Sequence, residues 1–253
     1  MSPARQHRER ILAAQAANAA LPGIAAAPPT SGAAAMAYEQ MLLQLHEDRR
    51  RLHDIQSVEK KIALKRDLLP AYAAWVEGAL TAGRESGRAV QDEVIVNVLP
   101  WLIDVGAYRD AIAVAEHVLR FRLVMPERFK RTPACYVTEE IAEASIAATT
   151  AGTGFSVHAL VQLEEITEGH DMPDEVRAKL HKAIGLELAR QADAASPDDD
   201  TLIAGFVPAT RTEALARLNR ALALNGKAGV KKNIEALERA LKKDAPVTTA
   251  ISG

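Results

Sequence analysis

The sequence predicts an all-α protein. Alanine and leucine, which favour helices, are abundant, whereas aromatic residues make up only 4% of the chain and runs of β-branched residues are rare. In several segments apolar residues recur every three or four positions, which is the period of a helix with one buried face. Hydrophobic residues make up 48% of the 253 residues, enough for one or two compact cores. We therefore expect helical hairpins.

The first 35 residues differ from the rest of the chain. A short segment around Arg8–Ala20 can form a helix, but prolines and glycines then interrupt an alanine-rich stretch. Such a composition offers few large apolar side chains to bury. It predicts a disordered N-terminal arm over residues 1–35.

Apolar residues close to heptad spacing predict one long amphipathic helix from Tyr38 to Leu69, which Pro70 ends. Charged residues interrupt the apolar stripe, so the helix is not expected to form a coiled coil by itself. Either the rest of the same subunit or a neighbouring subunit can cover this stripe. The residues that we assign to self-association are Met41, Leu45, Leu52, Ile55 and Ile62.

Three helices are expected next, over residues 71–82, 91–104 and 106–119, with glycines at the first break. The segment 106–119 resembles the second helix of a tetratricopeptide repeat, and so does the segment 214–225. The sequence between these two segments does not repeat the signature. We therefore predict helical hairpins with tetratricopeptide-like segments rather than a regular solenoid.

In the second half, Thr138 predicts the start of a helix that runs to Ala148, and Pro173 predicts the start of another that runs to about Arg190. Acidic residues follow each start, where they stabilise the positive end of the helix dipole. A closing helix is expected over 230–241. The predicted organisation is a disordered arm (1–35), a helical core with the long helix and a basic loop (36–170), a C-terminal helical region (171–243) with a linker at 192–210, and a frayed tail (244–253).

Composition excludes several classes of protein. The single cysteine, Cys135, rules out an intramolecular disulfide framework and a multi-cysteine zinc site, and it fits a reducing compartment. No apolar run approaches the roughly 20 residues that cross a bilayer, so no membrane association is expected. The sequence predicts a protein of the bacterial cytoplasm.

The sequence contains no recognisable catalytic motif. The glycines at 152–154 and 226–229 lack the arrangement of a phosphate-binding loop, and the seven histidines lack metal-ligand spacing. The acids of PDEVRAK at 173–179 lie in a first helical turn, where they favour helix initiation over magnesium binding. We expect no cofactor or metal site, and magnesium only if the chain itself cuts DNA. In that case the candidate acids are Asp92, Glu93, Asp104, Glu139 and Glu140.

The strongest signal for nucleic-acid binding is a basic segment at 120–131. It contains one acid, Glu127, and two interleaved aromatic residues, Phe121 and Phe129. Cations can neutralise phosphates while an aromatic ring supports the loop or meets a base. A solvated basic loop explains the same pattern. The candidate DNA-binding residues are Arg120, Arg122, Arg128, Lys130 and Arg131.

A second basic stripe follows the predicted long helix. It comprises Arg49–Arg51, Lys60, Lys61, Lys65 and Arg66. Acidic neighbours dilute these charges along the chain. This pattern favours an ordinary charged surface over a DNA contact.

Four segments carry a family resemblance. They are KRDLLP at 65–70, VMPERFKRTP at 124–133, MPDEVRAKLHK at 172–182 and AGVKKNIEALERALK at 228–242. With the Thr-Glu-Glu triplet at 138–140, they resemble the small terminase subunits of Peduovirus-type temperate tailed phages. The resemblance runs, with gaps, from about Met36 to Lys243.

The resemblance implies a protein that recognises double-stranded phage DNA at the packaging site and delivers it to a large ATPase subunit. It also implies a homo-oligomeric ring in the cytoplasm of the bacterial host. The family is labelled as the endonuclease subunit of the packaging enzyme, so cleavage belongs either to this chain or to the large subunit. Two other functions stay open: a tetratricopeptide-like adaptor without DNA binding, and a self-sufficient metal-dependent endonuclease.

Overall fold

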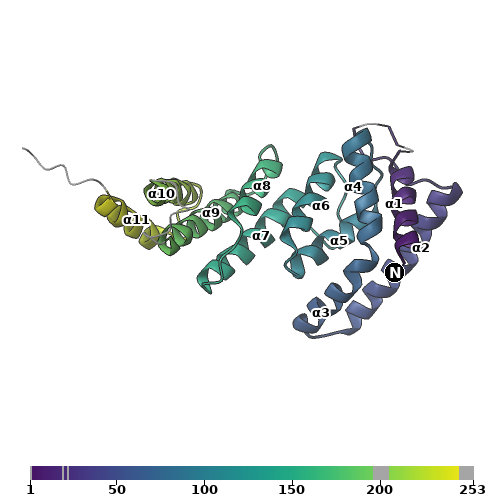
Figure 1. The fold of residues 1–253 in the computed structure, drawn as a ribbon, viewed down its shortest axis with the longest axis horizontal. Coiled ribbons are helices and arrows are strands. Elements are labelled where there is room, and N and C mark those ends of the chain that lie inside the picture. Colours follow the sequence, from purple (N-terminus) through teal and green to yellow (C-terminus); the bar gives the residue numbers. More distant parts are fainter. Residues whose placement is uncertain (1, 19, 22, 196–204, 245–253) are drawn as a thin grey trace, which may run out of the picture. The chain divides into compact units, whose positions relative to one another are not determined.

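The computed structural model describes the whole chain except residues 1, 19, 22, 196–204 and 245–253 (Figure 1). Its described residues form α-helices and one 3-10 turn and contain no strand, which confirms the all-α prediction. None of these helices is long and apolar enough to cross a membrane. The elements are α1 (Pro3–Asn18), α2 (Gly32–Asp54), α3 (Val58–Leu68), η1 (Leu69–Ala71), α4 (Ala73–Ser86), α5 (Glu93–Asp104), α6 (Tyr108–Arg120), α7 (Pro133–Thr150), α8 (Val157–Thr167), α9 (Asp174–Ala194), α10 (Phe206–Leu224) and α11 (Lys231–Asp244).

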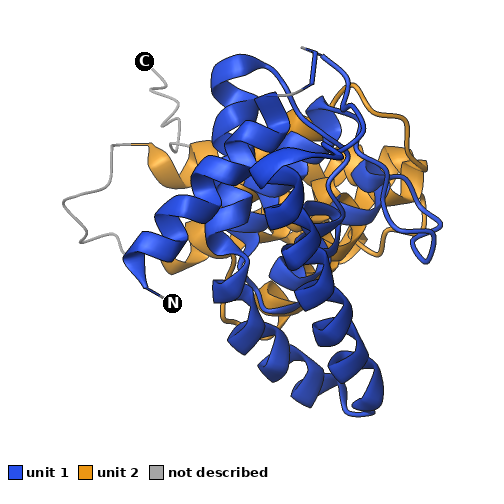
Figure 2. Cartoon of the chain, turned by 90° about the vertical axis from the view of Figure 1, so that its right-hand side faces the viewer, with its two compact units in different colours: residues 1–137 blue, residues 138–253 orange. Residues whose placement is uncertain are grey.

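The chain divides into two compact units, residues 1–137 and 138–253 (Figure 2). The prediction had placed the boundary near residue 170. The helical hairpins are present in both units: α5 packs on α6 in unit 1, and α9 packs on α10 in unit 2. The two tetratricopeptide-like segments lie in α6 and α10, and their relation to that repeat stays a prediction.

The expected disordered arm is wrong for the part that forms α1. This helix packs against α4, and its Ala13, Ala16 and Ala17 are almost completely buried. The approach is close because the facing residue is Gly78, where an added Cβ would lie 2.3 Å from the carbonyl oxygen of Arg10. Small side chains therefore create the contact here, through close backbone packing rather than through large apolar groups.

The segment after α1 is also held in place. The backbone N–H of Gly23 donates to Gly87, that of Ala25 to Phe121 and that of Ala26 to Ala89. The N–H of Gln91 in turn donates to Ala26 at 2.7 Å. Backbone hydrogen bonds, which composition cannot reveal, fix this proline-containing stretch.

The single helix predicted from Tyr38 to Leu69 is instead two helices, α2 and α3. The chain leaves the helical conformation at Ile55, and the Ser57 side chain accepts a hydrogen bond from the N–H of Lys60 at the start of α3. A serine N-cap at this position supplies a partner for one otherwise unbonded donor. The break lets α2 and α3 pack on each other as a hairpin.

The proposed self-association stripe is mostly internal. Met41, Leu45 and Leu52 are 4%, 1% and 7% exposed, because the core of unit 1 covers them. The assignment of these three residues to an oligomer contact is therefore wrong, and packing within the subunit is the alternative that holds. Ile55 and Ile62 remain partly exposed.

Two expectations for the second half need correction. The helix predicted to start at Thr138 starts five residues earlier, at Pro133, and Thr138 is fully buried inside α7. The linker predicted at 192–210 is shorter, because α9 continues to Ala194 and α10 begins at Phe206. Residues 196–204 and the predicted frayed tail from 245 onward lie outside the described residues.

Unit 2 has its own core. A cluster of buried apolar residues from α10, α11 and the turn between them packs against partly buried residues that include three from α9. Gly185 allows α9 and α10 to approach closely, since a Cβ there would lie 2.7 Å from the Leu218 side chain. The members of the cluster are Ala214, Leu218, Val230, Ile234 and Leu237.

Replacing Gly78 by alanine should loosen α1 from α4. The added methyl group meets backbone atoms of Arg10 that cannot rotate away, and overpacking of this kind costs roughly 1–3 kcal/mol. Hydrogen–deuterium exchange should accelerate over residues 3–18 in particular. Gly226→Ala is the matched control, because no atom lies within 4 Å of its Cβ position. Equal exchange of α1 in both variants would contradict the close packing.

Candidate nucleic-acid interface

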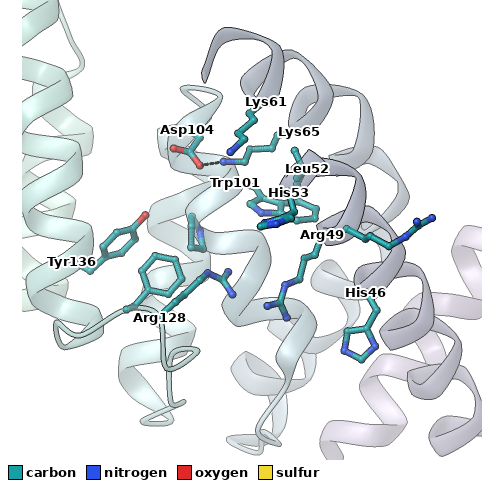
Figure 3. A pocket seen from close by; sticks show the side chains of 13 residues that line it. His46, Arg49, Leu52, His53, Lys61, Lys65, Trp101, Asp104, Arg128 and Tyr136 are labelled. Atoms are coloured by element: carbon teal, nitrogen blue, oxygen red, sulfur yellow. Dashed lines mark hydrogen bonds and ion pairs between the residues drawn. The ribbon is translucent and has the colours of Figure 1, made fainter. Parts of the chain in front are cut away.

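Unit 1 contains a cavity of about 800 Å³ with mostly cationic and aromatic walls (Figure 3). Four parts of the chain line it: α2, α3, the end of α5, and the segment from Arg128 to Tyr136. We call it the basic cavity. It brings the two basic stretches of the sequence, which are about 70 residues apart, to one place.

Helix α2 presents one polar face to the basic cavity. His46, Arg49, Arg50 and His53 recur at spacings of three, one and three, which places them on the same side of a helix. Two acids lie between them. Glu47 pairs with Arg50 at 2.8 Å, whereas Asp48 is only 5% exposed and bonds to Tyr72 and Arg51. The helix thus separates Arg49 from Asp48.

Asp48 holds α2 in this orientation. Its carboxylate accepts hydrogen bonds from the Tyr72 hydroxyl at 2.7 Å and from Arg51 at 3.0 Å. The Tyr72 ring meets the Trp101 ring edge-on, with 5.7 Å between centroids. Trp101 is itself part of the cavity wall, so the same contacts fix both the cationic face and the wall behind it.

Helix α3 adds Lys61 and Lys65, one turn apart on the same face. Lys65 pairs with Asp104, at the end of α5. Asp104 is the one carboxylate among the described residues that line the cavity. This ion pair ties α3 to α5, and Lys61 forms no ion pair with a described residue.

The loop after α6 is anchored by its alternating side chains. Phe121, Leu123 and Met125 are buried, and the Gln91 side chain both donates to and accepts from the backbone of Val124, at 2.9 and 2.8 Å. The anchored loop delivers Arg128 to the cavity.

Arg128 is held by two neighbours. Its Nη2 donates to Oδ1 of the fully buried Asn97 at 2.7 Å, and its guanidinium lies 4.7 Å from the centre of the Phe129 ring. Burial, and then the nearby Arg49, lower the pKa of Arg128 from its ordinary value. Figure 3 shows the two guanidinium groups pointing toward the same space. An anion that binds between two like charges relieves their repulsion.

The structure separates the five predicted DNA-binding residues. Arg128 lines the basic cavity, whereas Arg120 lies beside a different, much smaller pocket and stacks on Phe121 at 5.2 Å. Arg131 stacks on the Tyr136 ring at 5.4 Å. Arg122 and Lys130 are exposed and do not line the cavity. Phe121, one of the two interleaved aromatic residues, is a core residue at 2% exposure and cannot meet a base.

The sequence prediction assigned the basic residues of α2 and α3 to an ordinary charged surface, because acidic residues lie among them along the chain. The helical spacing of His46, Arg49, Arg50 and His53 was the available signal, because it separates these four from Asp48. The aromatic wall could not be found this way, since Trp101 lies far from them in sequence.

The candidate catalytic acids do not form one site. Asp92 and Asp104 flank α5 at its two ends, about 18 Å apart along the helix axis. Asp92 is buried and serves as the N-cap: it accepts from the N–H groups of Val94 and Ile95 and from the indole N–H of Trp75. Glu93 follows it in the first turn.

The other two acids, Glu139 and Glu140, belong to α7 in unit 2. Lys179 of the MPDEVRAKLHK segment donates to Glu139 at 2.6 Å and also to Glu143. Arg177 of the same segment donates to the carbonyl oxygens of Thr167 and His170, which fixes the turn between α8 and α9. Two basic residues of the PDEVRAK stretch therefore make structural contacts.

No group of three or more His, Cys, Asp or Glu side chains suitable for a metal ion occurs in the part of the chain that the structure describes. Among the candidate acids, Asp92 caps α5, Asp104 pairs with Lys65 and Glu139 pairs with Lys179.

Comparisons with known proteins agree on one family. The sequence profile of the phage small terminase subunit family matches residues 42–175. The chain is 42% identical over 241 residues to the terminase endonuclease subunit of Escherichia phage P2, which covers 95% of this chain and 86% of that protein. It is 25% identical over 200 residues to the probable terminase endonuclease subunit of Haemophilus phage HP1, covering 78% and 68%. No solved structure gives a significant match.

Asp92 should make stability depend on pH. Burial raises its pKa from 3.8 to about 6, against the opposing hydrogen bonds from Trp75, Val94 and Ile95. A raised folded-state pKa gives stability that is present below pH 4 and lost as the pH rises through 6. The free energy of unfolding of the wild type, minus that of Asp92→Asn, should therefore fall by about 3 kcal/mol between these limits. Chemical denaturation at several pH values measures this difference, and a constant difference would show that Asp92 does not titrate in this range.

Proposed function

The chain belongs to the phage small terminase subunit family, and from this premise we propose that it recognises viral DNA at the packaging site and delivers it to the large ATPase subunit. The observation that supports DNA recognition is the meeting of cations from α2, α3 and the Arg128 loop at one cavity. Phosphate groups are the anions that such a cluster fits in a DNA-packaging protein. The net charge of the chain is −2, so the binding potential is local.

Three cations carry the proposal. Arg49, Lys61 and Arg128 line the cavity, and the one carboxylate of its described lining is engaged by Lys65. Charged groups without an acidic partner retain their full attraction for an incoming phosphate. Arg50 also lines the cavity, but Glu47 pairs with it at 2.8 Å and reduces its contribution.

We further propose that the protein acts as a homo-oligomer in the host cytoplasm, with phage double-stranded DNA and the large subunit as partners. Burial of Met41, Leu45 and Leu52 leaves Ile55 and Ile62, near the turn between α2 and α3, as the accessible part of the original stripe. The mass of the purified chain by light scattering tests self-association directly.

A second candidate function comes from the names of the relatives, both of which are called endonuclease subunits. Intrinsic cleavage needs acids that hold a metal ion and stabilise developing charge. In this chain Asp92 caps a helix, Asp104 pairs with Lys65 and Glu139 pairs with Lys179. These roles favour recognition over cleavage as the function of the chain.

Replacing Arg49 and Lys61 by alanine should weaken binding to packaging-site DNA and reduce its salt dependence. Each lost phosphate contact lowers the log–log slope of affinity against salt by roughly 0.9, so the double variant should lose up to about 1.8. Fluorescence anisotropy over a range of salt concentrations measures both quantities.

The control for this experiment removes the same number of charges from the same region. Lys60 and Arg66 are exposed on α3 but do not line the cavity. The Lys60→Ala, Arg66→Ala variant should retain most of the affinity and slope. If both double variants lose affinity equally, the protein attracts DNA by general charge and the cavity has no special role.

The purified chain should retain packaging-site DNA over a scrambled control without cutting it. Gel retardation and gel analysis of the DNA after incubation with magnesium or manganese give both readouts. Metal-dependent cutting would assign the nuclease to this chain if Asp104→Asn or Glu139→Gln abolished it. Circular dichroism must show that such a variant keeps its helicity. A failure to retain either DNA would support the adaptor function instead.

A further inference from the structure

Helices α5, α6 and α7 end with the same capping pattern. One backbone N–H after the helix donates to the carbonyl oxygen three residues back, and the next N–H donates to the one five residues back. The first of these two donors belongs to a residue in the left-handed conformation, which glycine adopts without steric cost. This residue is Gly106 after α5 (φ 80°), Gly152 after α7 (φ 76°) and Arg122 after α6 (φ 56°). The chain thus has an arginine where it twice has glycine.

No contact within the fold accounts for this arginine. Arg122 is the one non-glycine residue with a positive φ in the part of the chain that the structure describes. That conformation is unfavourable for a residue with a Cβ atom. The Arg122 side chain is exposed and forms no hydrogen bond or ion pair with a described residue. Arg120 already supplies a cation to the last turn of α6, where the helix dipole favours one. The position therefore indicates a role for the Arg122 guanidinium at the surface.

Two more arginines lie at this end of α6. Arg120 is exposed, and its guanidinium lies 5.2 Å from the centre of the Phe121 ring. Arg84, in the last turn of α4, lines the same small pocket as Arg120. Neither forms an ion pair with a described residue, although the carboxylate of Glu116 belongs to the same lining. We call Arg84, Arg120 and Arg122 the arginine end of α6. It is a cationic surface outside the basic cavity.

A guanidinium group forms paired hydrogen bonds with phosphate or carboxylate groups. DNA phosphate is favoured here, because the loop that starts at Arg122 leads to Arg128, where the proposed function places DNA. The six residues from Arg122 to Arg128 span at most about 22 Å, whereas one turn of B-DNA is about 34 Å long. A single binding site on a duplex is therefore long enough for both arginines.

We propose that the arginine end of α6 binds phosphates of duplex DNA outside the basic cavity, with Arg122 as the main contact and Arg120 beside it. This inference rests on the proposed DNA recognition and adds a second contact surface to it. At position 122 the fold and the ligand then favour different residues. Glycine suits the left-handed backbone, and arginine suits the phosphate.

The test measures the affinity of the full chain for a packaging-site duplex by anisotropy over a range of salt concentrations. Arg122→Gly should lower the log–log slope of affinity against salt by about 0.9, because one phosphate contact is lost. Its unfolding midpoint in urea should stay equal or rise, since glycine relieves the left-handed conformation. Arg122→Lys keeps a cation at the same place and should keep the slope.

Arg109→Ala is the matched control. Arg109 is exposed on the first turn of α6, so this variant removes the same charge from the other end of the same helix. It should keep the slope of the wild type. A second copy of the chain is the other partner that the arginine end could bind, through carboxylates. Light scattering separates the two: the Arg120→Ala, Arg122→Gly variant should keep the mass of the wild type and lose up to about 1.8 from the slope.

An unchanged slope in Arg122→Gly overturns the second contact. An equal loss in Arg109→Ala also overturns it, because the DNA then responds to general charge. A lower unfolding midpoint together with a lower slope would make Arg122 a structural residue, and a changed mass with an unchanged slope would assign the surface to a contact between copies. Both results overturn the proposal.

The same measurements keep this proposal distinct from the proposed function. If the slope falls in Arg122→Gly but not in the Arg49→Ala, Lys61→Ala variant, the arginine end of α6 holds as a contact and the basic cavity does not. If only the cavity variant lowers the slope, the cavity stands and the second contact is overturned. If the wild type binds no DNA, the proposed function fails, and the second contact fails with it.

Discussion

The buried carboxylate of Asp92 is the interaction on which the rest of unit 1 depends. It begins α5 by accepting two backbone N–H groups, and it fixes α4 by accepting the indole N–H of Trp75. Tyr38 of α2 stacks on that indole with 5.8 Å between centroids, and its hydroxyl accepts the N–H of Glu93. Burying a carboxylate is unfavourable, and the three donors offset part of that cost, while the rest raises the pKa of Asp92. One side chain therefore sets the positions of three helices.

Helix α5, which Asp92 anchors, carries three residues that form or support the basic cavity. Along its length it carries Asn97, which orients Arg128, then Trp101, which forms part of the cavity wall, and finally Asp104, which pairs with Lys65. The cations come from other elements, and residues of α5 hold two of them, Arg128 and Lys65. Helix α5 therefore holds Arg128 in place before any ligand binds, which reduces the ordering that binding requires.

Tertiary packing explains two large differences between expectation and structure. The N-terminal segment looked disordered because it lacks large apolar residues, yet alanines facing Gly78 let α1 lie directly on α4. The stripe on α2 looked like a subunit contact because it is longer than a short neighbour would cover. The core of unit 1, with α2 and α3 folded into a hairpin, covers most of it, so Met41, Leu45 and Leu52 face inward.

The sequence by itself determined the helical class, most helix positions and the family, because apolar periodicity and specific strings such as MPDEVRAKLHK are local properties of the chain. It also identified Arg128 as a candidate contact. Only the tertiary structure decided which cations act together. Charge averaged along the chain mixes Asp48 with Arg49 and Arg50, whereas the helix turns the acid toward Tyr72 and the arginines toward the cavity. The meeting of Arg49 with Arg128 and the aromatic wall depends on contacts between residues far apart in sequence, which no local pattern encodes.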